Sequence, residues 1–399
     1  MLKYLSNKEE SAFTFLLGFA FASLFFRQGL IHLSGLMFLI ALFFYRPRLP
    51  WIGPFWWLIG FLLWEWISHY AGPYPGLGIE GGGIGYHFFY VFLPMTLLVL
   101  PMHAVARGVL IGAGCASVLI WVQGLIGVDL DASPLRINWD GGELFSRPPG
   151  FNRRAWETQF IFSMVFLTVF MLYRSRGKAY WFTMISLISG VLLPQIRAVF
   201  AAFIVALSWQ IIFRRPSGDV MLLLRKLGLI ALVAIIGFSA MAYLRPNFSK
   251  NLLSGNGRDK IFVVSFEVVK EFPLTGVGGG EYFKEHYQKA WLELGWSSKS
   301  PLFDIGHAHN DMLMMLAHHG WPMLLLWLGF VLHSLLFVWK HGKRRDKVLF
   351  SSLVIMHHFA GLAETYMDYS NTTYAIMLCY GMALHGPTMR WKKQRAKLA

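Results

Sequence analysis

Residues 318–339 read HHGWPMLLLWLGFVLHSLLFVW, and the basic run KHGKRRDK follows at 340–347. The first stretch contains no Asp, Glu, Lys or Arg. A helix needs about 20 mainly apolar residues to span a bilayer, and basic residues accumulate on its cytoplasmic side. The stretch therefore predicts a membrane-spanning helix whose C-terminal end faces the cytoplasm.

The whole chain has the composition of a membrane protein rather than of two or three soluble domains. Of its 399 residues, 56% are hydrophobic and only 14% are charged, whereas soluble domains carry about 25% charged residues. The net charge of +15 would suggest nucleic acid in a soluble chain. In a chain this apolar it indicates orientation in a membrane, so no nucleic-acid partner is expected. Cys115 and Cys379 lie in apolar runs and form no CxxC metal pair.

Twelve apolar stretches are predicted to span the membrane, which makes the fold class all-α, a polytopic helical bundle. They are residues 11–26, 29–45, 51–69, 86–100, 104–127, 156–173, 179–194, 197–213, 221–243, 318–339, 348–364 and 371–388. An even number of spans places both termini on the same side of the membrane.

The distribution of Lys and Arg decides which side that is. When the N-terminus is placed in the cytoplasm, 22 of the 36 basic residues fall on that side, five of them in 340–347 and five in 390–397. The outer stretches 69–85 and 364–371 contain none. Both termini are therefore predicted to be cytoplasmic.

The chain is expected to divide into three parts. Residues 1–243 hold the first nine spans with an outer loop at 128–155, residues 244–308 form a large outer loop, and residues 309–399 hold the last three spans and a basic tail. Long connections are usually functional, so the chemistry is expected on the outer side. Within the large loop, residues 259–271 are predicted to form an amphipathic helix. The expected apolar face consists of Ile261, Phe262, Ser265, Val268 and Val269.

The large outer loop ends in Gly306-His307-Ala308-His309-Asn310-Asp311. The His-x-His-x-Asp pattern resembles part of a metallohydrolase signature, but the usual next histidine is Met312 here, and zinc needs three or four ligands. No metal is therefore expected. His309 is instead a candidate general base, because imidazole titrates near neutral pH; a loop histidine that caps the next helix is the structural alternative. Asn310 or Asp311 is expected to cap that helix, and Asn310 and His307 are candidate supporting residues.

Arginines on the outer side, where basic residues are scarce, are candidate anion ligands. Arg197 begins a span, where a charge costs roughly 2.5–3.5 kcal/mol on insertion scales, and Arg258 begins the amphipathic helix, whose N-terminus favours anions. Arg147, Arg153 and Arg154 precede the span at 156–173. The structural alternatives are an interfacial arginine for Arg197 and pairing with nearby acids for the others.

Two further signals are weaker. Glu65 and Glu157 lie near the outer ends of predicted spans, where acids are usually functional, although either could pair with an outer arginine. The run Gly276-Val277-Gly278-Gly279-Gly280-Glu281 misses the GxGxxG pattern, so no dinucleotide site is expected.

Taken together, these motifs resemble the bacterial O-antigen ligase and polymerase superfamily, and above all O-antigen ligase. His309-Asn310 followed by Gly320 is similar to the family's His-Asn…Gly run, and Gly257-Arg258 before Pro273-Leu-Thr-Gly276-Val-Gly278 is similar to its Arg…Pro-Leu-x-Gly-x-Gly stretch. Arg197, and Arg147 in Arg-x-x-Gly150-Phe151, also match family positions. Where the family often has Asn-Pro-Asn, this chain reads Asn152-Arg153-Arg154, which leaves the roles of residues 152–154 open.

The resemblance implies a glycosyltransferase at the periplasmic face of the bacterial inner membrane, with a GT-C-like architecture and in contact with membrane lipids. Its donor would be a polysaccharide on undecaprenyl diphosphate, and its acceptor a sugar hydroxyl of lipid A–core. The reaction would invert the anomeric centre and use no metal or other cofactor. His309 would be the base, Arg147, Arg197 and Arg258 would bind the diphosphate, and Arg154 would support them.

Three alternatives stay open at the level of the sequence. O-antigen polymerase and protein O-oligosaccharyltransferase share the lipid-diphosphate donor and differ in the acceptor. A twelve-span transporter belongs to a different class, and it is disfavoured because the two halves of the chain show no internal repeat.

Overall fold

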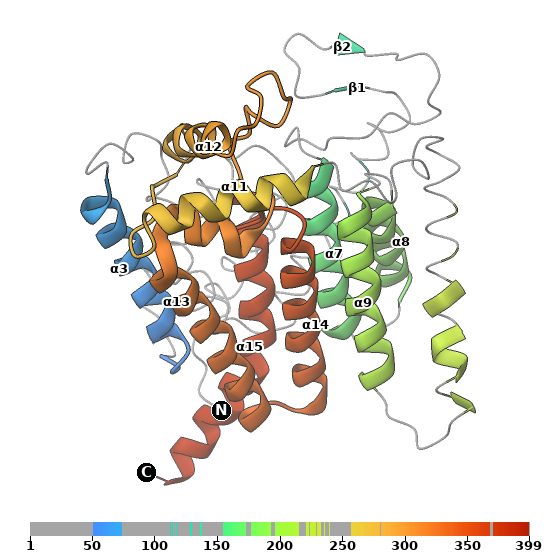
Figure 1. Cartoon of the computed structure of the whole chain (residues 1–399). Coiled ribbons are helices and arrows are strands. Elements are labelled where there is room, and N and C mark those ends of the chain that lie inside the picture. Colours follow the sequence, from blue (N-terminus) through green and yellow to red (C-terminus); the bar gives the residue numbers. More distant parts are fainter. Residues whose placement is uncertain are drawn as a thin grey trace.

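The computed structural model describes residues 51–73, 155–172, 177–192, 196–214, 257–279, 281–367 and 370–398, and isolated parts of 112–137 and 221–239. In this part of the chain nearly all regular structure is helical (Figure 1). The helices are α3 (Phe55–Ala71), α7 (Ala155–Leu172), α8 (Lys178–Leu192), α9 (Arg197–Arg214), α11 (Arg258–Glu271), α12 (Glu281–Glu293), α13 (Asp311–His341), α14 (Arg344–Gly361) and α15 (Ser370–Leu398). The exception is a hairpin of two-residue strands, β1 (Val128–Asp129) and β2 (Arg136–Ile137), which the sequence analysis did not predict.

Seven predicted spans coincide with described helices: those in α3, α7, α8, α9, α13, α14 and α15. α9 and α13 are long and apolar enough to cross a membrane, and Glu157–Leu172 and Tyr180–Leu192 are shorter apolar helices. The spans at 11–26, 29–45 and 86–100 lie outside the described residues, as do most of 104–127 and much of 221–243. The all-α class is thus confirmed for the described chain, while the count of twelve and the GT-C likeness stay predictions.

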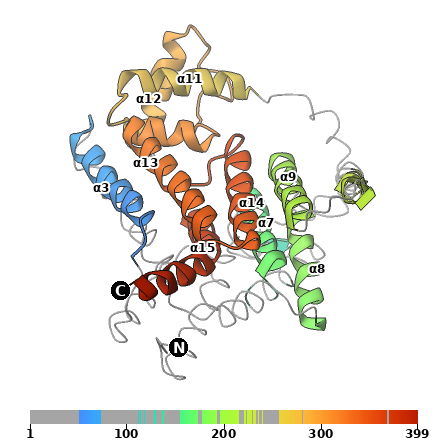
Figure 2. The same ribbon diagram turned by 90° about the horizontal axis from the view of Figure 1, so that it is seen from below.

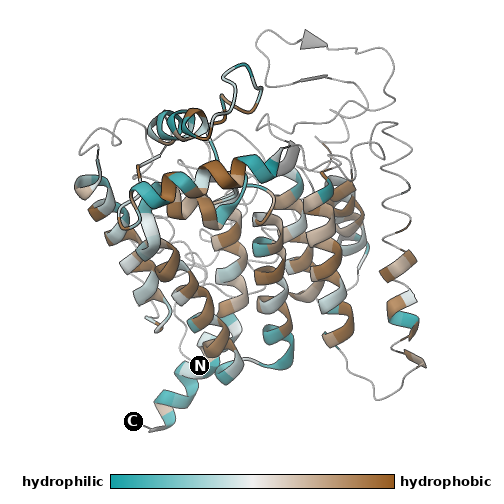
Figure 3. Cartoon of the chain, viewed as in Figure 1, coloured by the Kyte–Doolittle hydropathy of each residue, from teal (hydrophilic) through white to brown (hydrophobic). Residues whose placement is uncertain are grey.

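Hydrophobic residues make up much of the bundle helices (Figure 3). They form a buried apolar core, and others are exposed on the surface of the bundle. On α3 and α13 the outward side chains include large hydrophobic ones that are about half exposed or more: Trp56, Leu63, Trp66, Leu325, Leu332 and Leu336. Contiguous apolar surface of this kind is unfavourable in water and is typical of helices that face lipid.

The two ends of the bundle differ in chemistry. Arg344 Nε donates to the Phe213 carbonyl over 2.7 Å, so α9 and α14 are antiparallel, and Arg197 and Gly361 lie towards the opposite end. Arg390 Nε donates to the His341 carbonyl over 2.6 Å, which brings the basic tail back to the basic run at 340–347. α11 and α12 lie at the other end (Figure 1), and seen along the bundle they lie to one side of it, next to α13 (Figure 2). The basic segments and the large-loop helices therefore occupy opposite ends of the molecule.

Two helices correct the expected boundaries. The span predicted at 318–339 belongs to α13, which already begins at Asp311 and is interrupted at Gly320, whose φ of +76° is not helical. The helix starts early because Asn310 caps it and the apolar run after Asp311 continues the helical pattern. The predicted amphipathic helix is α11. Its buried face includes Val264, whereas Phe262, which was expected on that face, is only half-buried. α12 was not predicted.

Candidate active site

His309 is held at the start of α13 by an uncommon backbone conformation. Its φ is +50°, in the left-handed region that few residues other than glycine adopt. The next residue, Asn310, is the N-cap, and its Oδ1 accepts from the Leu313 amide over 2.9 Å. The expected cap is thus confirmed for Asn310, which also fixes the position of the preceding imidazole. Asn310 Nδ2 in addition donates to the Leu362 carbonyl over 3.4 Å.

The imidazole of His309 meets a buried carboxylate from a distant part of the chain. Glu364 lies in the turn after α14, its side chain is 10% exposed, and its Oε2 is 2.9 Å from His309 Nδ1. This contact joins the loop between α14 and α15 to the start of α13. A histidine whose Nδ1 is bound to a carboxylate carries its proton there and presents Nε2 as the acceptor.

The other oxygen of the same carboxylate binds Arg258. Arg258 Nη2 donates to Glu364 Oε1 over 3.0 Å, and the guanidinium is one-third exposed. Arg258 begins α11, directly after Gly257, whose φ of +73° favours glycine and where a Cβ would also meet a methyl group of Leu302. Three elements thus assemble a continuous chain of polar contacts, Arg258–Glu364–His309. The structural alternative paired Arg258 with a nearby acid, whereas the partner in the structure is 106 residues away.

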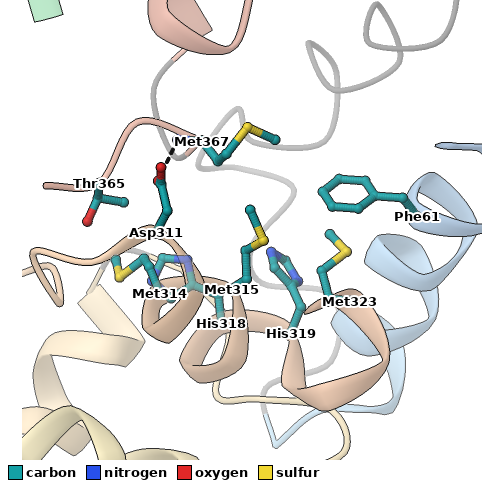
Figure 4. A pocket seen from close by; sticks show the side chains of 9 residues that line it. All are labelled: Phe61, Asp311, Met314, Met315, His318, His319, Met323, Thr365 and Met367. Carbon is teal, nitrogen blue, oxygen red and sulfur yellow. Dashed lines mark hydrogen bonds between the residues drawn. The ribbon is translucent and has the colours of Figure 1, made fainter. Parts of the chain in front are cut away.

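The turn that carries Glu364 is itself fixed by Asp311. Asp311 Oδ1 accepts from the amides of Tyr366 and Met367, over 2.5 and 2.8 Å, and its Oδ2 is 3.3 Å from His357 Nε2 (Figure 4). The side chain is buried. A buried carboxylate that accepts two backbone N–H groups is a strong local constraint, because the loss of either bond leaves a donor unsatisfied.

The contacts of Asp311 with the turn after α14 are called the clamp below. An apolar pocket lies beside this clamp (Figure 4). Four methionines line it, and Phe61 of α3 contributes an aromatic ring, while Asp311 forms part of its polar wall. The methionines are Met314, Met315, Met323 and Met367. Methionine is flexible and polarizable, so such a wall adapts to irregular apolar groups.

The linker between α11 and α12 is bonded to the interruption in α13. The amides of Val277 and Gly278 donate to the carbonyls of Ala317 and His318, over 2.8 and 3.0 Å, and the Trp321 amide donates to the Pro273 carbonyl over 2.9 Å. These bonds satisfy the backbone groups that the break in the helix leaves unpaired.

Two glycines make this approach possible. Both Gly276 and Gly320 have φ near +70°, and a Cβ on Gly320 would collide with the Leu274 carbonyl, one on Gly276 with the His318 backbone. Two motifs that looked independent in the sequence therefore pack directly against each other: the Pro-Leu-x-Gly-x-Gly stretch and the glycine after the His-Asn pair. This packed contact is called the glycine joint below.

Of the remaining predicted site residues, Arg197 and His307 lie in the part of the chain that the structure describes, and three arginines do not. Arg197 is the first residue of α9 and half-buried, and it lies at the same end of the bundle as Gly361. His307 is close to His309, with ring centroids 4.1 Å apart. Arg147, Arg153 and Arg154 lie outside the described residues.

Glu364 was missed by the sequence analysis, although a signal was present. It is an acid at the outer end of the predicted span 348–364, the same position that made Glu65 and Glu157 noticeable. Its pairing with Arg258 and His309 could not be read from spacing. One metal-capable group occurs among the described residues: His307, His309 and Glu364 each offer one ligand atom, and these atoms lie within 4.8 Å of one another.

Comparison with known proteins adds one finding. Residues 181–328 match a family model described as O-antigen ligase, a stretch that contains Arg197, Arg258 and His309 and ends before Glu364. A search of the curated proteins gave no match. The family is one of membrane proteins, in agreement with the two long apolar helices. Over residues 181–328, somewhat more than a third of the chain, the protein is therefore similar to the O-antigen ligase family.

Proposed function

We propose that the protein is an O-antigen ligase, which moves O-antigen polysaccharide from undecaprenyl diphosphate to a sugar hydroxyl of lipid A–core. The observation that carries this proposal is the Arg258–Glu364–His309 chain, with contacts of 3.0 and 2.9 Å. It combines, at one end of an apolar bundle, a base, the carboxylate that orients the base, and a cation for a phosphate.

His309 is the proposed base. With Nδ1 bound to Glu364, its Nε2 can accept the proton of the acceptor hydroxyl as the hydroxyl oxygen attacks the anomeric carbon. Glu364 fixes the ring and stabilises the imidazolium that forms, the part that a carboxylate plays in base–carboxylate pairs generally. Direct displacement inverts the anomeric centre.

The arginines are proposed to stabilise the leaving group. When the bond from the anomeric carbon to the diphosphate oxygen breaks, the bonding electrons stay on that oxygen and the diphosphate gains a negative charge. A guanidinium has five N–H donors, so Arg258 can bind phosphate oxygens while one nitrogen holds Glu364. We propose that Arg197 and Arg147 complete the diphosphate site, supported by Arg154. Such charge stabilisation needs no metal.

The surroundings suit lipid-linked substrates. The methionine-lined pocket is small and shares Asp311 with the clamp beside the site. The large apolar side chains exposed on α3 and α13 are suited to contact isoprenoid or acyl chains. We place the site at the periplasmic face of the bacterial inner membrane and both termini in the cytoplasm. Support comes from the separation of the basic segments and the large-loop helices at opposite ends. Holding two substrates that already share a membrane lowers the entropic cost of bringing them together.

The test is a gel of lipopolysaccharide from a strain that lacks the gene, complemented with wild type, His309→Ala or the control His341→Ala from the opposite end of the bundle. Loss of the long ladder with accumulation of undecaprenyl-linked polymer, rescued by wild type and the control but not by His309→Ala, is expected. Core with a single repeat unit in the deletion strain would indicate a polymerase instead. Unchanged lipopolysaccharide would exclude both functions.

A further inference from the structure

We propose that His307, His309 and Glu364 form a reversible binding site for a zinc-like transition-metal dication, and that the bound metal inhibits transfer by occupying the base. The three side chains offer one ligand atom each, all within 4.8 Å of one another. Imidazole nitrogen and carboxylate oxygen are ordinary zinc ligands, and three protein ligands with one open position form a common type of site.

The structure removes the objection that the sequence raised against a metal. The pattern from His307 to Asp311 supplied two histidines, and Met312 stood where a further histidine was sought. The third ligand comes instead from Glu364, 55 residues beyond His309 and joined to it at 2.9 Å. A site of this kind is assembled by tertiary contacts and leaves no continuous motif.

The geometry is close to that of a bound ion. Tetrahedral zinc with bonds of about 2.1 Å holds its ligand atoms roughly 3.4 Å apart. The contact between His309 Nδ1 and Glu364 Oε2 is already shorter than this, and the rings of His307 and His309 have centroids 4.1 Å apart. The ligand atoms all lie within 4.8 Å of one another, and both histidines are only half-buried, so the site is open to a solvent ion.

The ligands also select the class of metal. Two nitrogens and one oxygen suit Zn²⁺, Cu²⁺ or Co²⁺, whereas Mg²⁺ and Ca²⁺ prefer all-oxygen sites. Arg258 holds Oε1 of the carboxylate and leaves Oε2 for the ion. The positive charge of the guanidinium weakens attraction for a dication, so exchangeable binding is expected rather than a permanent structural zinc.

Occupancy has a direct consequence for His309. A metal on Nδ1 replaces the bond to Glu364 that orients the ring, and a metal on Nε2 takes the lone pair that would accept the hydroxyl proton. Either way the base is lost while the ion is bound. This inhibitory part rests on the proposed function, whereas metal binding itself does not.

Calorimetric titration of the full-length protein in detergent with ZnCl₂, purified without a polyhistidine tag, tests the binding. We expect one Zn²⁺ per chain, affinity at least tenfold weaker in His307→Gln and in Glu364→Gln, and no binding of MgCl₂. The control His341→Gln, at the opposite end of the bundle, should bind as wild type. CoCl₂ should give the visible absorption of a four-coordinate site, lost in His307→Gln. Equal affinity in wild type and His307→Gln would overturn the site.

Ligation assays with and without ZnCl₂ test the inhibition. Wild type should lose most of its activity in the presence of Zn²⁺ and regain it with a chelator, while His307→Gln, compared with itself without metal, should be much less sensitive. Zinc that binds without slowing ligation would overturn the inhibition and leave both the site and the proposed function. Unchanged lipopolysaccharide in the deletion strain would instead overturn the proposed function and leave the metal site.

Discussion

Glu364 Oε2 lies 2.9 Å from His309 Nδ1, although 55 residues separate the two in the chain. The carboxylate is buried in the turn after α14 and its other oxygen is bound by Arg258. The orientation of the imidazole therefore depends on three elements, the starts of α11 and α13 and the turn after α14. Disturbing any one of them should affect His309.

Replacing Glu364 with Gln should lower the ligation rate by about a hundredfold or more. The amide keeps the size of the side chain but removes the negative charge that stabilises the imidazolium. The measurement is kcat/KM for transfer in proteoliposomes with purified substrates. Glu267→Gln is the matched control, because Glu267 is half-exposed and, in the part of the chain that the structure describes, pairs with Lys270 on the surface of α11. A rate within twofold of wild type in Glu364→Gln would refute the role of the carboxylate.

Arg258→Lys should reduce kcat/KM by about tenfold or more. Lysine keeps the charge, but its ammonium lacks the planar fork that can bind Glu364 and a phosphate together. Arg345→Lys is the control, because Arg345 lies at the opposite end of the bundle and only weakly contacts Asp346, at 3.9 Å. If both variants retain full activity, a point charge is enough at position 258 and the forked geometry is irrelevant.

Gly320→Ala and Gly276→Ala should each destabilise the protein strongly, by several kcal/mol, because the new Cβ meets backbone atoms of the partner segment in addition to the strain of a positive φ. Gly295→Ala separates the two effects. Gly295 also has a positive φ, of +75°, but a Cβ there meets no atom within 4 Å, so only the strain of about 1 kcal/mol remains. The melting temperatures of the purified proteins give the comparison. Similar melting temperatures for all three variants would mean that the two packed segments of the glycine joint can move apart to accommodate a Cβ.

Sequence patterns predicted the positions of the helices better than they predicted the contacts between distant residues. The length of the apolar stretches located the helices at 155–214 and 344–398, and the helical spacing of apolar residues located α11. Both signals are local in the sequence. The interruption at Gly320 was hidden, since apolar residues lie on both sides of it, in Met312–Ala317 and again from Trp321 onwards. α12 was missed although its sequence carries a helical period, with Phe283, Tyr287, Ala290 and Trp291 buried along one face.

In the candidate site, too, single residues were predicted from the sequence, whereas the pairing between them was not. His309, Arg258 and Arg197 were noticeable as unusual residues for their place in the chain, and Asn310 was recognised as a cap by type and position. Glu364 was not selected, because its importance comes from two partners 55 and 106 residues away. Long-range pairing leaves no trace in the spacing of a single sequence.

The contact between α11 and α12 should weaken in acid. Partial burial opposes ionisation of Glu271, but hydrogen bonds and charge from Lys289 and His286 outweigh it, and the pKa of Glu271 is lowered from about 4.5. Its stabilising effect is therefore complete above pH 4.5 and is lost as the pH falls through the lower folded-state value. Hydrogen exchange of α12 should accelerate over that window in wild type, whereas Glu271→Gln should exchange faster at neutral pH and show a flatter profile. Parallel profiles for the two proteins would contradict this assignment.

Asp311 should be required for activity through the position of Glu364 rather than through contact with substrate. Asp311→Ala leaves the buried amides of Tyr366 and Met367 without their acceptor, at a cost of about 1–3 kcal/mol each, and frees the turn that holds the carboxylate. Asp311→Asn keeps Oδ1 as an acceptor, so it should retain most of the melting temperature and most of the ligation rate. If Asp311→Ala lost stability but ligated at the wild-type rate, the clamp would not position Glu364. If Asp311→Asn were as inactive as the alanine variant while remaining folded, the negative charge near His357, and not the clamp, would be what the reaction needs.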